Sequence, residues 1–344
     1  MRRDQLPPHK TATYVLARYK TVYVSVPKAA CTSLKWLVAG LQGESPERFY
    51  RSRSREVGRA MTIHRRDLWR HTPMLHELPE EELAAISPDD GWFVFAVVRH
   101  PSARVWAAWQ SKFLLREPRW IDEFAGAPWL PRVPQSTKDL VEDFGRFIES
   151  IASDPNQAVM RDRHFMSQSE LVTPATTPYT GVYETREIPL LLEDLDAHLR
   201  AQGWEGTLAL RRSNESPLAP LRSLFTPSVT ESIASLYGED FETFRYADVV
   251  PATTEPAAEY PHALLVAIGL LAERSERLGD LALRAQAFAD GERALREKNS
   301  ELRAKNKALR AESKALRSVN KTLRSRRGIR SVARRVYRKL AAPR

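Results

Sequence analysis

Residues 21–35 read TVYVSVPKAACTSLK, and they predict the element on which the rest of the fold depends. The first six residues are mostly β-branched or aromatic, which is typical of a short buried strand over 21–26. Pro27 ends this strand because it has no amide hydrogen to donate to a sheet. From Thr32 onward, apolar residues recur at spacings of three and four, which predicts a helix. Its apolar positions are Leu34, Leu37, Val38 and Leu41.

A second unit of the same kind occupies residues 92–116. The run WFVFAVV at 92–98 predicts a strongly apolar strand, and Arg99-His100-Pro101 forms the turn after it. The apolar face of the following helix consists of Val105, Trp106, Trp109 and Phe113. Further elements are expected as a strand at 179–184 and helices at 137–152, 187–201 and 227–238. Strand–turn–helix units in this order predict an α/β fold with a central parallel sheet, whose ligands bind at the carboxyl ends of the strands.

The charge of the chain is divided unevenly. The sequence has 344 residues and a net charge of +10, but residues 291–344 hold 19 Lys and Arg against 4 Asp and Glu. The other 290 residues hold 34 basic and 39 acidic side chains. We therefore expect a mildly acidic body, which argues against a body that wraps nucleic acid, and a separate basic C-terminal segment.

Cys31 is the only cysteine of the sequence. This excludes a disulfide framework and a cysteine-rich zinc site, and it fits a reducing cytoplasm. No apolar run reaches the length of about 18 residues that a membrane-spanning helix needs. The N-terminal MRRDQLPPHK lacks the apolar stretch of a secretory signal. We expect a cytoplasmic location.

Beyond a predicted linker at 251–261, residues 262–325 have the pattern of a long helix with coiled-coil periodicity. Large apolar residues fall every seven positions and are taken as d: Leu281, Phe288, Leu295, Leu302, Leu309, Leu316 and Leu323. The a positions are mostly polar, and arginine recurs at the e positions. We expect self-association through this segment, chiefly through its more apolar upstream heptads. A solvated single helix is the alternative.

Residues 326–344 form a basic amphipathic segment. One helical stripe is apolar: Ile329, Val332, Ala333, Val336, Tyr337 and Leu340. Arginines and one lysine surround it, a pattern that suits an anionic membrane surface. A disordered basic tail and an RNA-binding arm are alternatives, and we do not expect nucleic acid as the main partner.

The turn between the first strand and helix has the composition of an anion site. A lysine, Lys28, precedes a helix start that carries two hydroxyls, Thr32 and Ser33. Free amide groups and the helix dipole favour a bound anion at such a position. The turn is not a Walker loop, because the sequence has no glycine before Gly40. A phosphate-binding turn and a plain strand–helix turn with an exposed lysine both remain open on spacing alone.

Taken together, the two units resemble a known enzyme family. VPKAACTSLK at 26–35 and FVFAVVRHPSARVWAAWQSKF at 93–113 are similar to the two nucleotide motifs of sulfotransferases that use 3′-phosphoadenosine 5′-phosphosulfate (PAPS). The resemblance is greatest to the carbohydrate sulfotransferases of the chondroitin, HNK-1 and uronosyl 2-O type. Supporting similarities lie at Arg163-His164-Phe165 with Gln168, at 181–185 and at 236–241. The resemblance covers about residues 20–248.

This resemblance implies a P-loop-like three-layer sandwich around the parallel sheet, followed by the long helix or coiled coil. It also implies transfer of a sulfuryl group from PAPS to a sugar hydroxyl, without a metal. Lys28 would stabilise the leaving group, and Arg99 would grip the 3′-phosphate. The 5′-phosphate would be held by the turn: Lys28, Ala29, Ala30, Cys31, Thr32 and Ser33.

The sequence departs from the family pattern at one contact. Ala107 stands where the family has the serine that binds the 3′-phosphate. Ser111, one helical turn later, is expected to replace it, and the alternative sources of the contact are Arg104 or Arg211 and Arg212.

A general base must accept the proton of the acceptor hydroxyl, and a histidine suits that task. His64 lies in the segment where related enzymes have a histidine, so it is the expected base. His164 is the second candidate, while His71 and His76 fit capping or surface roles better.

These predictions divide the chain into a sulfotransferase-like catalytic domain over 1–250, the linker 251–261, the helix 262–325 and the tail 326–344. We expect an enzyme that acts on a glycan or glycolipid, peripheral on the inner face of a membrane. Two alternatives are a coiled-coil scaffold or adaptor whose nucleotide site has degenerated, and a P-loop-like small-molecule kinase.

Overall fold

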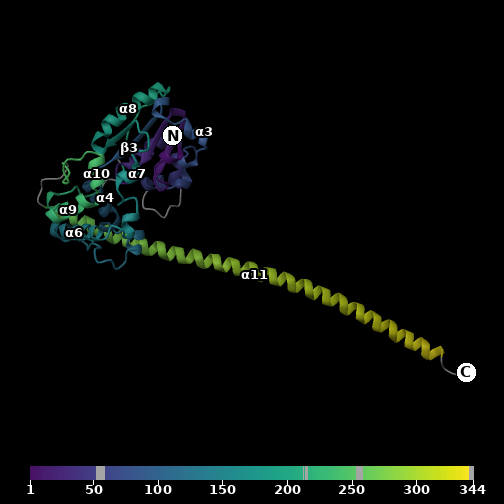
Figure 1. The fold of residues 1–344 in the computed structure, drawn as a ribbon. Helices are drawn as coiled ribbons and strands as arrows, with labels where there is room; N and C mark the ends of the chain where they lie inside the picture. Colours follow the sequence, from purple (N-terminus) through teal and green to yellow (C-terminus); the bar gives the residue numbers. More distant parts are fainter. Residues whose placement is uncertain (52–58, 212, 214–215, 253–258, 341–344) are drawn as a thin grey trace. The chain divides into compact units, whose positions relative to one another are not determined.

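The computed structural model describes residues 1–51, 59–211, 213, 216–252 and 259–340. Much of the predicted linker and the last four residues of the predicted tail lie outside this part of the chain. The described residues form a mostly parallel α/β body followed by one long helix (Figure 1).

The sheet has four strands in the order β1-β2-β3-β4: β1 (Ala12–Leu16), β2 (Thr21–Ser25), β3 (Phe93–Val98) and β4 (Gly181–Glu184). The three predicted strands are confirmed as β2, β3 and β4, which pair in parallel, with ends shifted by one or two residues. The predicted central parallel sheet is confirmed, and it carries one further edge strand, β1, which pairs antiparallel with β2. Only Ala17–Lys20 separate these two strands, and a connection this short permits a hairpin but not a crossover.

The sheet is buried, and its aromatic residues form a row across the strands. The rings of Tyr14 and Tyr23 have centroids 6.1 Å apart, and those of Tyr23 and Phe95 are 5.1 Å apart. Every residue of β1, β2 and β3 is buried, which explains why these strands read as continuous apolar runs. Helix α1 (Cys31–Leu41) contacts β1 and β2, whereas α8 (Ile188–Ala201) contacts β3 and β4.

A second hydrophobic core lies among α4 (Pro101–Trp109), α6 (Thr137–Ser153) and α9 (Pro227–Leu236). Helices α6 and α9 lie side by side (Figure 1), and Phe144 of α6 packs edge-on against Trp106 at 5.0 Å. The helix predicted at 227–238 corresponds to α9, which ends at Leu236, and α10 (Gly238–Thr243) follows it. Four shorter helices complete the body: α2 (Pro46–Arg51), α3 (Glu80–Ala84), α5 (Pro118–Glu123) and α7 (Gln168–Val172).

Two buried side chains, Tyr237 just before helix α10 and Asp240 within it, bond to the backbone at Phe165 and at the start of α7. The Asp240 carboxylate accepts hydrogen bonds from the amides of Gln168 and Ser169 at 2.8 and 2.7 Å. The Tyr237 hydroxyl donates to the carbonyl of Phe165 at 2.7 Å. These bonds fix Phe165 and the first two residues of α7.

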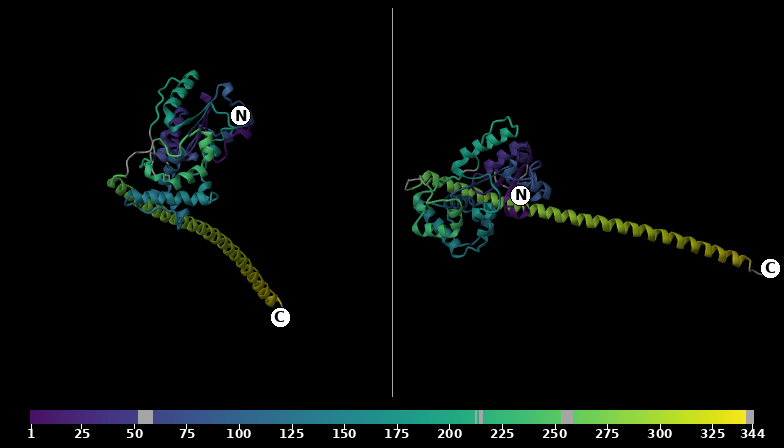
Figure 2. Two further views of the ribbon diagram at one scale, coloured as in Figure 1. Left: turned by 60° about the vertical axis from the view of Figure 1, so that its left-hand side comes forward. Right: turned by 45° about the horizontal axis from the view of Figure 1, so that its top comes forward.

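Helix α11 (His262–Leu340) has 79 residues, and it is uninterrupted in both further views (Figure 2). The predicted helix 262–325 and most of the predicted tail are therefore one helix. Its first turns belong to the compact unit Met1–Gly279, where Leu265, Ile268 and Ala272 are buried. The second unit is Asp280–Arg344. No helix within the described residues is long and apolar enough to cross a membrane.

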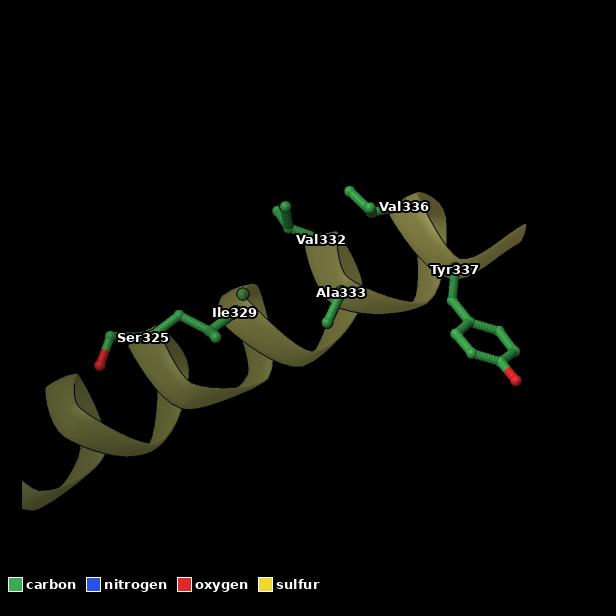
Figure 3. A pocket seen from close by; sticks show the side chains of 7 residues that line it. Ser325, Ile329, Val332, Ala333, Val336 and Tyr337 are labelled. Atoms are coloured by element: carbon green, nitrogen blue, oxygen red, sulfur yellow. The ribbon is translucent and has the colours of Figure 1, made fainter. Parts of the chain in front are cut away.

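Self-association and membrane binding are both expected through apolar side chains of α11, and these side chains are exposed. The heptad residues from Leu281 to Leu323 are all at least about half exposed. Farther along, Ile329, Val332, Val336 and Tyr337 form a bare apolar surface with Ala333 (Figure 3). Self-association and membrane binding both stay predictions.

Replacing Asp240 by alanine should destabilise the body, because two buried amides lose their acceptor. Each unsatisfied group costs about 1–3 kcal/mol, so the melting temperature should fall by about 5–10 °C. Thermal unfolding followed by circular dichroism would measure this. Glu239→Ala, at the neighbouring exposed position, is the matched control and should change little. Equal melting temperatures for the two variants would contradict the role of Asp240.

Candidate active site

The turn from β2 into α1 adopts a backbone conformation that its residues do not favour. Lys28 and Ala30 both have positive φ angles, 66° and 55°, although neither is glycine. Each such residue costs about 1–2 kcal/mol relative to its preferred conformation. No side chain caps the start of α1 among the described residues, so the amides of its first turn remain available to a ligand. The uncapped amides favour binding of an anion, and backbone strain of this kind is frequent at ligand sites.

Lys28 places an unpaired amino group at this turn. Burial, reinforced by the nearby positive charge of Lys112, lowers the pKa of Lys28 to about 7. In the described part of the chain its Nζ atom has no hydrogen-bond or ion-pair partner. A partly buried cation without a partner is costly, so a bound anion would relieve the cost and favour the charged form.

A hydrogen-bonded chain supports the turn from the side of His64. The His64 Nδ1 lies 3.0 Å from Lys35 Nζ, and the His64 Nε2 lies 3.0 Å from the Thr32 hydroxyl. An ammonium group can only donate, so Nδ1 accepts and Nε2 carries the hydrogen that is donated to Thr32. Burial and the charge of Lys35 lower the pKa of His64 to about 2, so the ring stays neutral. The Thr32 hydroxyl is thereby left free to donate its own hydrogen to a ligand.

Both nitrogens of His64 are therefore engaged within the protein. In this geometry neither is available to a substrate hydroxyl, which does not fit the expected role of general base. His64 instead positions Thr32, and this histidine connects the first turn of α1 to the short 3-10 turn Arg59–His64.

Arg99 joins the second turn to the first. Its backbone amide donates to the Gln168 side chain at 2.9 Å, and the Gln168 amide donates back to the Arg99 carbonyl at 2.7 Å. The guanidinium Nη1 lies 3.4 Å from the Lys28 carbonyl oxygen. Burial and the neighbouring Arg104 lower the pKa of Arg99. The two sequence motifs thus meet, as the strand order predicts, at the carboxyl ends of adjacent parallel strands.

Arg104 is a structural residue. Its guanidinium donates to the carbonyls of Pro27, Met166 and Arg163 at 3.1, 2.7 and 2.7 Å, and the side chain is fully buried. These bonds tie the turn after β2 to the segment before α7. Three of its five N–H groups are used for backbone carbonyls, which favours this structural role over the alternative that Arg104 contacts the nucleotide.

The helix after Arg99 changes its winding close to the site. Helix α4 runs into a π-helical turn at Gln110–Leu114, a feature that is frequent at functional sites. Ala107 is fully buried, whereas Ser111 lies in the π-helical turn and is half-buried.

Lys112 belongs to the same π-helical turn, and its side chain is buried. Its Nζ pairs with Glu117 at 2.6 Å and lies 5.4 Å from the centre of the Trp120 ring. It is close enough to lower the pKa of Lys28. Lys112 therefore adds a second lysine to the positive surroundings of the site.

An acid–histidine pair lies in the same surroundings. His164 Nδ1 is 2.7 Å from an oxygen of Asp162, which also accepts the His164 backbone amide at 2.9 Å. Burial, with Lys112 and Lys28 as neighbours, lowers the pKa of His164 well below its usual range. The neutral ring donates Nδ1–H to the carboxylate, and its Nε2 has no hydrogen-bond partner within the described residues. This is the arrangement of an oriented general base.

Comparison with known families identifies the chain. A family profile described as "Sulfotransferase family" matches residues 11–247, more than half of the sequence. The chain belongs to the sulfotransferase family. No curated protein and no solved structure matches it. The match separates this sulfotransferase from the small-molecule kinases considered above, and it implies PAPS as the sulfuryl donor.

The residues of the sulfotransferase site fit that donor. Its 5′-phosphosulfate would meet Lys28, the Thr32 hydroxyl and the uncapped amides of α1. Arg99 would supply a planar fork for the 3′-phosphate. No group of three or more His, Cys, Asp or Glu side chains placed to hold a metal ion occurs in the described ranges.

Some site residues could be predicted and others could not. The structure brings together Lys28, Arg99 and both leading histidine candidates. It places His71 and His76 elsewhere: His71 is exposed, and the His76 ring stacks on His9 at 4.2 Å. Sequence reasoning missed Lys35, Lys112 and Asp162. Asp162 could have been noticed as a carboxylate two residues before a candidate base.

Binding of 3′-phosphoadenosine 5′-phosphate, the desulfated donor, should take up protons. Because the pKa of Lys28 is about 7 in the free protein and a bound phosphate raises it, part of the population must gain a proton near pH 7.5. Affinity should therefore be highest below pH 7 and decline as the pH rises above it. Calorimetry in buffers of different ionisation enthalpy measures the uptake.

Lys28→Arg is the matched control, because a guanidinium stays charged throughout this range. Its complex should form with less proton uptake and a flatter pH dependence. Identical proton uptake by the wild type and Lys28→Arg would contradict the lowered pKa of Lys28.

Proposed function

We propose that this sulfotransferase transfers the sulfuryl group of PAPS to a hydroxyl of a carbohydrate, in a glycan or a glycolipid. The paired motifs at 26–35 and 93–113 resemble those of carbohydrate sulfotransferases, which supports the acceptor class. The observation that carries the proposal is the Asp162–His164 pair, because it supplies an oriented base among the same charges that surround Lys28.

The transfer proceeds by in-line displacement. The acceptor oxygen forms a bond to sulfur while its proton passes to His164 Nε2. The bond between sulfur and the bridging oxygen of the 5′-phosphate breaks, and its electron pair stays on the phosphate. Lys28 stabilises the negative charge that develops on this leaving group. The products are a sulfate ester and 3′-phosphoadenosine 5′-phosphate.

His164 is the base in this proposal, and His64 acts through Thr32. His164 has a free Nε2, and Asp162 stabilises the imidazolium that forms when the ring accepts a proton. In the free protein burial of the ring, together with the charges of Lys112 and Lys28, holds the pKa of His164 low. An anionic donor placed among these lysines offsets their charge and moves that pKa toward neutrality, where a base works best. Base strength is thus coupled to the presence of the donor.

Ser111 is the proposed replacement for the serine absent at position 107. Its side chain is half-buried, and its hydroxyl forms no hydrogen bond within the described residues. The 3′-phosphate contact is then built from Arg99 and a hydroxyl one helical turn farther from the sheet.

Removing the base should lower turnover without removing donor binding. For His164→Ala we expect a loss in kcat of about 10²–10⁴-fold with nearly unchanged affinity for 3′-phosphoadenosine 5′-phosphate. Asp162→Asn should lower kcat in the same direction. The assay follows radiolabelled sulfate from PAPS onto a panel of polysaccharides and glycolipids, with a phenol and a tyrosyl peptide as other acceptor classes.

His64→Ala is the comparison variant. It should weaken donor binding, because Thr32 loses its support, and it should affect kcat less than His164→Ala does. The assignment of the base fails if His64→Ala abolishes turnover while His164→Ala retains it. The carbohydrate proposal fails if only the phenol or the peptide is sulfated.

A further inference from the structure

An exposed leucine seam runs along the second unit of the chain. Leu295, Leu302, Leu309, Leu316 and Leu323 recur every seven residues on one helix, and between 49% and 63% of each residue is exposed. A repeat of seven is the period at which a second helix can follow the first over many turns. The seam is therefore shaped for a helix rather than for a small ligand.

The flanks of this seam are cationic. The residues after the leucines, at the e positions, are all arginine: Arg296, Arg303, Arg310, Arg317 and Arg324. Lys298 and Lys305 occupy g positions on the other flank, where Glu312 is the one acidic residue. Arg296 pairs with Glu292 on its own helix, whereas the other four arginines have no carboxylate partner in the described part of α11.

This charge pattern opposes pairing with a second copy. In a parallel pair, Lys298 and Lys305 of one copy would face Arg303 and Arg310 of the other, since g meets the e residue five positions later. In an antiparallel pair, arginines at e would face one another. Glu312 is the one flanking residue that would give a favourable pair, with Arg317 in the parallel case or with a g-position lysine in an antiparallel one. Like charges next to a coiled-coil core disfavour a partner.

We propose that the seam at 295–324 binds an acidic amphipathic helix of another protein. Such a helix would carry leucine at a spacing of seven, with glutamate or aspartate on both flanks of that stripe. Its core would also hold polar residues opposite Asn299, Asn306 and Asn320, which occupy a positions and fix register. This partner replaces the self-association expected from the repeat alone, and it is independent of the transfer reaction.

The leucine repeat ends at Leu323, and this limits the length of the proposed interface. After Leu323 the next core positions of the repeat are Arg327, Arg330 and Arg334. The apolar residues that follow, including Ile329, Val332 and Val336, occupy c and f positions of the repeat and so lie on another face of the helix. A partner helix in the seam would therefore stop near Arg324 and leave the terminal apolar stripe uncovered.

The test uses the full chain and a synthetic helical probe of about 30 residues, with leucine at d, asparagine at a and glutamate at e and g. Sedimentation should show the wild type as a monomer at micromolar concentration. Fluorescence anisotropy at physiological salt should show one probe bound per chain. Leu302→Ala/Leu309→Ala should weaken binding at least tenfold, and circular dichroism checks that the helix persists.

Charge reversal provides the sharpest variant. Arg303→Glu/Arg310→Glu should lose affinity for the acidic probe and, because Lys298 and Lys305 now face glutamates, should turn the chain into a parallel dimer. The proposal is overturned if the wild type is a dimer that ignores the probe. It is equally overturned if a scrambled probe of the same composition binds as well, because the helix would then be a general polyanion-binding surface.

Discussion

Two cationic side chains, Lys28 and Arg99, lie at the ends of two parallel strands, and neither forms an ion pair with a carboxylate of the described residues. Lys28 and Arg99 are linked through the Lys28 carbonyl, and both have lowered pKa values because they are withdrawn from water. Keeping such groups close together costs free energy that an anion can recover. The chemistry of the site follows from this imbalance of charge.

Buried hydrogen bonds around the site fix the backbone segments that carry Lys28 and Arg99. Arg104 binds the carbonyls of the turn after β2 and of the segment before α7, and Gln168 clamps the backbone of Arg99. Asp240 fixes the amides of Gln168 and Ser169 from α10. The segments that match the sulfotransferase family far from the nucleotide motifs are thus parts of one scaffold, which holds His164 near the lysines.

The sequence was informative where periodicity and composition act locally. The strands at 21–25 and 93–98, the lysine turn and the arginine turn could all be read from short runs of residues. The antiparallel β1 was missed, because its five residues carry no signal of which edge they join. The π-helical turn that contains Lys112 has no signature in the sequence, and the Lys35–His64 contact depends on tertiary folding.

The most direct test of this account is calorimetric titration of the wild type and Arg99→Ala with 3′-phosphoadenosine 5′-phosphate, with ADP as the control nucleotide. The wild type should bind the 3′-phosphorylated nucleotide much more tightly than ADP, and Arg99→Ala should lose most of this preference. Equal binding of the two nucleotides by the wild type, or a preference that Arg99→Ala retains, would contradict this account.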